Sequence, residues 1–269
     1  MLISVQLTLQ RIGALFLRHI FLHYESWPRL VEMLYWPVIN MATWGFTSLY
    51  FIKKYTDSPI ISATLVGAVL LLEIYLRTIT NILVLFLEEI WSRNLGHLFA
   101  SPLSIIEYTV SLVLSALTRM FIAIIPAILL ASYLFNFSLF SLGLSLFLYV
   151  FLLAFNACWY GLLVISLLLR FGLAAEWLGW MSAWIMTPLL APYYPVTILP
   201  PFLQIVAYAL PATYVFESMK EQMNQHTSHS SNLLIALLLN IFYSFVAAWI
   251  LSRAYKAARN KGSLLQMGE

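Results

Sequence analysis

Long runs of apolar residues dominate this chain, separated by short segments rich in charge or proline. Six of the runs are near the length of about 20 residues that a helix needs to cross a bilayer core of about 30 Å. The pattern predicts spans at 33–52, 61–87, 105–133, 139–169, 172–190 and 233–252. We therefore expect an all-α polytopic membrane protein with six transmembrane helices, forming a single transmembrane domain over residues 31–269.

The segment before the first predicted span, residues 1–30, has the period of an amphipathic helix. One face is polar and the other apolar, with polar residues Ser4, Thr8, Arg11, Arg18, Glu25 and Arg29 and apolar residues Leu7, Ile12, Phe16, Ile20 and Phe21. Two arginines and Pro28 fit poorly in hydrocarbon. We therefore expect a helix that lies in the membrane interface, rather than a polar beginning of the first span.

Composition supports the membrane class and narrows the chemistry. Hydrophobic residues make up 62% of the chain and charged residues 9%, whereas roughly 25% of residues are charged in an ordinary soluble domain. The net charge of +3 is too small for a nucleic-acid-binding surface, so no nucleic acid partner is expected. Cys158 is the only cysteine, which excludes an internal disulfide and a thiolate zinc site.

Basic residues indicate the orientation of the chain. An even number of spans puts both termini on one side of the membrane, and the cytoplasmic side carries the excess of Lys and Arg. The side of the termini would hold Arg11, Arg18, Arg29, Arg93, Arg170, Arg253, Lys256, Arg259 and Lys261, and the other side would hold Lys53, Lys54 and Lys220. Both termini, and with them the helix at 1–30, are therefore predicted to be cytoplasmic.

Two of the predicted connections are more than simple turns. Residues 88–101 carry Glu89, Arg93 and His97 at helical spacing and end before Pro102, so they predict a short amphipathic helix. The outer connection contains the segment 188–211, whose apolar pieces are too short to cross the membrane. Its prolines are Pro188, Pro192, Pro195, Pro200, Pro201 and Pro211. This segment predicts a stiff re-entrant hairpin.

The order of these elements, with "ASPLS" at Ala100–Ser104 and "PYYPVTILPPFLQIVAYALPATYV" at Pro192–Val215, resembles the membrane subunits of type-2 ABC exporters, the ABC-2 permeases. The resemblance implies that 88–101 is a coupling helix that contacts an ATPase, through Glu88, Glu89, Arg93, Asn94, Gly96, His97, Leu98 and Phe99. It also implies that the hairpin forms an extracellular gate, with the residues Pro192, Tyr193, Tyr194, Pro195, Pro200 and Pro201.

The sequence contains no G-x-x-x-x-G-K-[ST] phosphate loop, so this chain is not expected to be an enzyme or to bind a cofactor itself. The resemblance implies that ATP and Mg²⁺ bind to separate ATPase subunits in two copies. It further implies a second copy of the permease, a substrate path between the two copies, and a location in the bacterial inner membrane among lipid. The implied cargo is a lipid, a glycolipid or polysaccharide, or an amphipathic drug-like molecule.

Three charged residues fall inside the predicted spans: Glu73, Arg77 and Arg119. A charge at the centre of a spanning helix costs about 2.5 to 3.5 kcal/mol, so these residues should be paired. Glu73 and Arg119 lie at equal heights along neighbouring antiparallel spans, which predicts an ion pair between them and leaves Arg77 free. The charges either lock the two spans together or line a substrate path.

Other classes of function have less support in the residues. An ion-coupled secondary transporter needs acids in the membrane that bind and release protons or sodium, and Glu73 is the one clear candidate. A membrane-embedded enzyme needs clustered polar groups at a membrane face, and none appears. His226 and His229, near Glu217 and Glu221, have metal-ligand spacing, but a polar outer loop explains them more simply, and no metal is expected.

Overall fold

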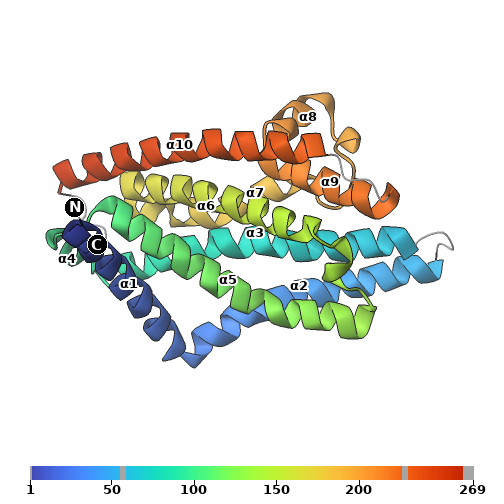
Figure 1. Ribbon diagram of the computed structural model, residues 1–269, viewed down its shortest axis with the longest axis horizontal. Coiled ribbons are helices and arrows are strands. Elements are labelled where there is room, and N and C mark those ends of the chain that lie inside the picture. The colour runs from blue at the N-terminus through green and yellow to red at the C-terminus, as the bar shows by residue number, and fades with distance from the viewer. Residues whose placement is uncertain (1, 55–58, 226–229, 263–269) are drawn as a thin grey trace.

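A computed structural model describes residues 2–54, 59–225 and 230–262 of the chain (Figure 1). Long helices lie side by side along one axis, and the described residues contain no β-strand. The α-helices are α1 (Leu2–Tyr24), α2 (Trp27–Lys54), α3 (Pro59–Trp91), α4 (Leu95–Ala100), α5 (Ile105–Phe135), α6 (Ser145–Phe171), α7 (Glu176–Leu190), α8 (Pro201–Tyr208), α9 (Pro211–Gln225) and α10 (Ser230–Asn260). The predicted all-helical class is confirmed.

Four stretches among the described residues are long and apolar enough to cross a membrane: Ala63–Trp91, Ile105–Phe135, Ser145–Leu190 and Ser230–Asn260. They support the prediction of a membrane protein. The α2 helix is not among them. A total of six spans stays a prediction.

The third stretch has 46 residues, about twice what one crossing needs. It consists of α6, a 3-10 turn at Gly172–Ala175 and α7. Gly172 has a φ of 68°, a backbone angle that glycine adopts without strain, and the chain reverses there. The Tyr160 hydroxyl donates to the Ser182 carbonyl oxygen at 3.1 Å, and Gly179 faces Val164, so α7 runs back along α6.

The α3 helix is the centre of the bundle. It contacts α2, α5, α6, α7 and α9, and 89% of its most apolar window is buried inside the protein. The hydroxyls of Thr78 and Thr80 donate to carbonyl oxygens of the preceding turn of the same helix, which satisfies these polar groups without a partner helix. By contrast, only 22% of the most apolar 18-residue stretch of α10 is buried. This helix therefore lies on the outside of the bundle.

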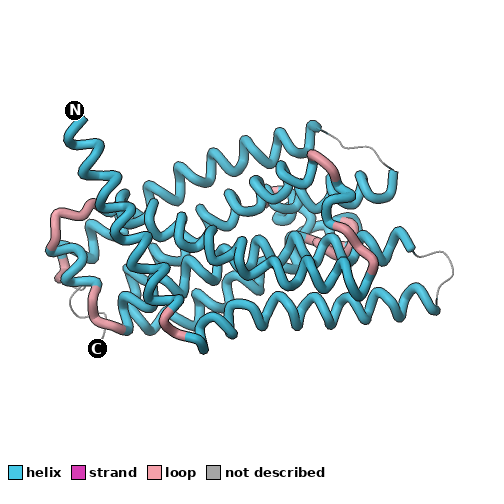
Figure 2. Tube along the Cα trace, turned by 60° about the horizontal axis from the view of Figure 1, so that its bottom comes forward, coloured by secondary structure: helices cyan, strands magenta, loops and turns pink. Residues whose placement is uncertain are grey.

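The two ends of the bundle carry different elements. The beginning of α1 and the end of α10 lie with α4 at one end, the left of Figure 1, and Figure 2 shows the same arrangement from another side. The α8 and α9 helices lie at the other end, near the 3-10 turn Leu139–Leu142 that precedes α6. We call the end with α4 the α4 end and the opposite end the α9 end. A common end for both termini agrees with an even number of crossings.

The α1 helix is shorter than the predicted segment 1–30. It ends at Tyr24, a new helix begins at Trp27, and Arg29 therefore belongs to α2. The polar face of α1 points into the protein, where Arg11 and Arg18 form ion pairs with α5 and α3. Its apolar face is open, and Phe21 is 59% exposed. The position of α1 in a membrane interface stays a prediction.

Close packing of α6 on α3 depends on Gly161. A Cβ atom at this position would lie 2.9 Å from the side chain of Ile82, which is fully buried and cannot move aside. We predict that Gly161→Ala lowers the midpoint of thermal unfolding in detergent, at a cost of about 1 to 3 kcal/mol for overpacking. Gly13→Ala is the control, because a Cβ there has open space. Equal midpoints for both variants would contradict the prediction.

Candidate functional site

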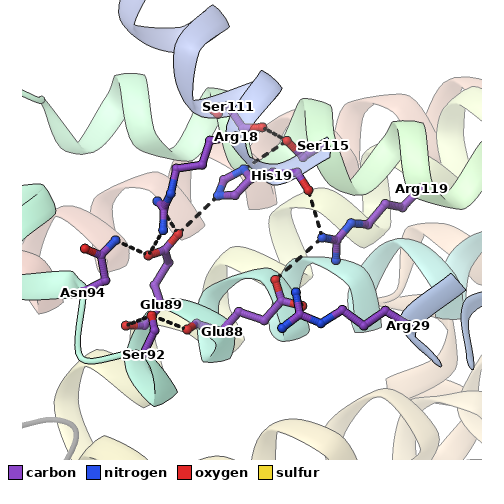
Figure 3. Close-up of polar contacts among 10 residues, drawn as sticks. All are labelled: Arg18, His19, Arg29, Glu88, Glu89, Ser92, Asn94, Ser111, Ser115 and Arg119. Atoms are coloured by element: carbon purple, nitrogen blue, oxygen red, sulfur yellow. Dashed lines mark hydrogen bonds and ion pairs between the residues drawn. The ribbon is translucent and has the colours of Figure 1, made fainter. Parts of the chain in front are cut away.

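Two adjacent carboxylates at the last turn of α3, Glu88 and Glu89, organise the α4 end (Figure 3). The Glu89 side chain is 3% exposed and accepts two hydrogen bonds from the Arg18 guanidinium of α1, at 2.7 and 3.0 Å. The amide of Asn94 donates to the same carboxylate at 2.7 Å. Nε2 of His19 lies 3.6 Å from it. A buried carboxylate needs this number of partners to offset its loss of hydration.

Glu88 contacts a different pair of helices. Its Oε2 lies 3.7 Å from the Arg119 guanidinium of α5, and its Oε1 lies 3.6 Å from that of Arg29 in α2. Arg119 also donates to the carbonyl oxygen of His19 at 3.4 Å. The imidazole of His19 in turn lies 3.1 Å from the Ser115 hydroxyl of α5. Adjacent residues of α3 thus hold α1, α2 and α5 at one point.

The prediction of a single helix over 88–101 is wrong. The α3 helix continues through Trp91, the backbone turns at Arg93 with a φ of 53°, and α4 begins at Leu95. Glu88 and Glu89 therefore do not share a helical face with Arg93 and His97. The ion pairs with Arg18, Arg29 and Arg119 supply the physical reason. They hold both carboxylates against the bundle, and the chain has to leave α3 before it can turn outward.

The α4 helix lies on the bundle through its apolar side. Leu95 is buried, and Leu98 packs against the same cluster. The Phe99 ring packs against Tyr108 of α5 and Tyr255 of α10, with ring centroids 5.5 and 4.8 Å apart. Leu98 and Phe99 are thus half-buried on the protein's own bundle, and their contact with a partner protein stays a prediction. Among the charged and titratable side chains of this turn and of α4, Arg93 and His97 are exposed.

The charges in the middle of the bundle pair differently from the prediction. Glu73 forms an ion pair with Arg77 at 3.1 Å and accepts a hydrogen bond from the Asn40 amide of α2 at 2.6 Å. Arg119 pairs instead with Glu88. Side chains of a helix lean toward its N-terminus, so Glu73 leans toward the α9 end and Arg119 toward the α4 end. The heights expected from the sequence therefore do not bring the two charges together.

A cavity of about 530 Å³ opens beside this network, between α1, α2, α3, α5 and α7. We call it the Trp–Arg pocket. Its principal lining residues are Arg29, Arg77, Arg119, Trp36, Trp180 and Trp184. His23 and Glu88 also face it. Burial, together with Arg119 and Arg29, lowers the pKa of His23 to about 4, so this imidazole is neutral at pH 7.

The predicted outer hairpin is held by a buried lysine. Lys220 of α9 donates to the carbonyl oxygens of Ala191 and Tyr194 at 2.9 and 2.6 Å, and to Glu217 at 2.6 Å. Glu217 also accepts from the backbone N–H of Val196 at 3.1 Å. Burial lowers the pKa of Lys220, and Glu217 opposes that shift. The turn after α7 is thus fixed to α9.

The proposed gate residues do not form one surface. Pro192 is buried, and Tyr193 stacks on Trp44 of α2 with ring centroids 4.4 Å apart. Tyr194 is half-buried and donates to the Pro188 carbonyl oxygen at 2.8 Å. Pro195, Pro200 and Pro201 are exposed, and Pro201 begins α8. A gating role for these residues is untested.

A metal at the outer loop is not tested by the structure, because His226 and His229 lie outside the described residues. Within the described ranges, no group of three or more His, Cys, Asp or Glu side chains could hold a metal ion.

Sequence reasoning missed two features of the site. Lys220 reads as an outer-side charge in a polar segment, and no local pattern marks it as buried. The Trp–Arg pocket draws Trp180 and Trp184 from α7 to α2, α3 and α5. Their spacing of four residues was a usable signal, since it places both indoles on one helical face.

No family model matches this chain, and no curated protein does either. The resemblance to the ABC-2 permeases therefore remains an interpretation of the sequence.

The two pairings of Glu73 differ in their predicted double-mutant cycles. We expect Glu73→Gln and Arg77→Met to be non-additive in unfolding free energy by about 0.5 to 3 kcal/mol, because the two side chains are in contact. The cycle of Glu73→Gln with Arg119→Met should be additive within about 0.5 kcal/mol. Unfolding in detergent measures both cycles. A larger coupling in the second cycle would restore the original pairing.

The low pKa of His23 predicts loss of stability in acid. The folded state binds a proton to this imidazole only near pH 4, whereas the unfolded state does so near pH 6.5. Stability should therefore fall as the pH drops through this interval and level off below it. His23→Gln should show a shallower fall in the unfolding midpoint, while His97→Gln, which alters an exposed histidine, should match the wild type. Parallel curves for all three proteins would contradict the assignment.

Proposed function

We propose that this chain is the membrane subunit of an ATP-driven exporter of the ABC-2 type, with ATP hydrolysis on separate subunits. The observation that carries the proposal is the position of α4. It joins α3 to α5 at the α4 end. Its apolar side packs on the bundle, with Phe99 in contact with α5 and α10. Force applied to its exposed side would reach three helices at once.

The ionic network strengthens this mechanical argument. Glu89 binds both Asn94, in the turn before α4, and Arg18 of α1. On the far side of α4, the Ser104 hydroxyl accepts from the Glu107 backbone, and Glu107 accepts from the Ser104 N–H, which caps α5 rigidly. Both connections of α4 are therefore stiff. A stiff connection transmits a displacement, whereas a flexible loop absorbs it.

We assign a smaller coupling surface than the one that the sequence predicted. Glu88, Glu89, Leu98 and Phe99 serve the interior, so we assign the contact with an ATPase to the exposed Arg93 and His97 and to the turn at Ser101 and Pro102. Two copies of the membrane chain and two ATPase subunits would form the transporter, in the bacterial inner membrane with both termini cytoplasmic. The cargo class proposed is an amphipathic molecule.

An ion-coupled secondary transporter has less support. Its coupling acid would have to exchange a proton or sodium ion with water. Glu73 is 2% exposed and already bound to Arg77 and Asn40. A permanently paired carboxylate does not exchange ions readily, because releasing its partner would leave a buried cation.

The test is the isolation of the tagged chain from its native membranes, followed by labelling with 8-azido-ATP and an assay of Mg·ATP hydrolysis. We expect a co-purified ATP-binding chain. The double variant Arg93→Glu/His97→Glu should reduce its yield by about tenfold, because charge reversal at a rim weakens association. Arg259→Glu is the control, since it reverses an exposed charge in the last turn of α10, at the α4 end of the bundle but outside α4.

The outcomes separate clearly. Normal membrane yield of the double variant with loss of the ATP-binding chain supports coupling through α4. An equal ATPase complement in the double variant and the wild type would show that α4 is not the coupling element. The absence of any ATP-binding chain from the wild-type preparation would contradict the proposed function.

A further inference from the structure

The Trp–Arg pocket has the size and lining of a ligand site. Its volume of about 530 Å³ falls in the range of about 300 to 1,000 Å³ found for small-molecule sites. Five helices contribute to it, so its shape depends on the whole α4 end of the bundle and not on one loop. Neither the proposed coupling surface nor the outer hairpin uses its residues.

The inner part of the pocket carries a positive charge that the protein does not neutralise. Arg29 and Arg119 share the single carboxylate of Glu88, at 3.6 and 3.7 Å. Arg77 is balanced by Glu73. The other carboxylate in the lining, Glu32, is exposed at the rim, where water screens it. Arg119 is buried and Arg29 is 41% exposed, and these two guanidiniums share one carboxylate in the inner part of the pocket.

Polar atoms in the same part of the pocket lack partners. Arg119 is 2% exposed, yet its buried Nε has no hydrogen-bond partner among the described residues. Both ring nitrogens of His23 are also buried without a hydrogen bond in the described structure. An unpartnered buried donor costs about 1 to 3 kcal/mol. A ligand with several acceptor oxygens would satisfy the Nε of Arg119 and the one ring nitrogen of neutral His23 that carries a proton.

The outer part of the pocket is aromatic. Trp36 of α2 and Trp184 of α7 are 46% and 47% exposed, and Trp180 lies one turn before Trp184 on the same face. An indole combines an apolar body with one polar N–H, which suits it to the boundary between lipid tails and headgroups. The pocket therefore leads from an apolar surface inward to unneutralised guanidiniums.

We propose that the Trp–Arg pocket binds a phosphate-bearing amphiphile, with the phosphate between Arg29, Arg119 and His23 and the apolar body against Trp36, Trp180 and Trp184. The guanidinium fork matches phosphate oxygens, and one negative charge of a phosphodiester would complete the balance around Glu88. The role of the pocket as the loading site for cargo rests on the proposed exporter function. The binding itself does not.

A cationic amphiphile in a tryptophan cage is the rival occupant. Cation–π binding would need the carboxylates of the pocket to be available. Glu88 already faces two arginines, and a bound cation would come close to both. The charge of the pocket therefore favours the anion.

The test uses the purified full chain in nanodiscs of phosphatidylcholine, with tryptophan fluorescence as the readout. Dibrominated phosphatidylglycerol, which carries a net negative phosphodiester, should quench saturably at a low mole fraction. Dibrominated phosphatidylcholine should quench only in proportion to its amount. Glycerol phosphate is added as a soluble competitor, and we expect it not to displace the brominated lipid, because it lacks an apolar body.

Arg29→Gln should weaken the apparent affinity for the brominated anionic lipid by about tenfold, the change expected for loss of one charge-assisted contact. The matched control is Arg11→Gln. Both arginines are ion-paired and similarly exposed, at 41% and 38% of the side chain, but Arg11 pairs with Glu107 outside the pocket. Trp184→Phe should reduce the saturating quench without changing the midpoint by more than about threefold.

Equal quenching by the anionic and zwitterionic lipids, or stronger quenching by a dibrominated trimethylammonium lipid, would overturn the proposal. So would equal effects of Arg29→Gln and Arg11→Gln. Displacement by glycerol phosphate would show that the headgroup alone binds and would overturn the amphiphile assignment. Co-purification of an ATP-binding chain is measured on the same samples. A preparation that retains that chain but shows no selective quenching refutes the pocket and leaves the exporter proposal intact.

Discussion

The burial of two neighbouring carboxylates at the end of α3 is the constraint on which the α4 end depends. Glu88 and Glu89 lie where the central helix leaves the bundle, and each needs cations to offset lost hydration. Those cations come from other helices: Arg18 from α1, Arg29 from α2 and Arg119 from α5. The network therefore ties together elements that are far apart in the sequence.

This constraint also explains the path of the chain around α4. Since both carboxylates stay inside, the chain turns at Arg93 before the short helix begins, and the apolar side of α4 closes over Tyr108 and Tyr255. The exposed side of α4 and of the turn before it keeps His97 and Arg93 as its charged or titratable groups. Two of these arginines, Arg29 and Arg119, share the single carboxylate of Glu88 and line the Trp–Arg pocket. One electrostatic arrangement thus shapes both the candidate coupling surface and the candidate binding site.

Sequence reasoning predicted helix positions well where the chain is both apolar and capped. The predicted span 105–133 matches α5, whose beginning is marked by the capping box of Ser104 and Glu107. It was less accurate where tertiary contacts overrode local pattern. The amphipathic period across 88–101 indicated one helix, but the interior ion pairs of Glu88 and Glu89 break that continuity.

The sequence by itself predicted the membrane class and the helical architecture, because both follow from the length and hydropathy of the apolar runs along the chain. Only the tertiary structure decided which charges meet. Glu73 and Arg119 were expected at matching heights, but their side chains lean in opposite directions, since their helices are antiparallel and side chains follow helix polarity. The buried position of Lys220 and the convergence of Trp36, Trp180 and Trp184 likewise depend on packing between helices, which no local pattern encodes.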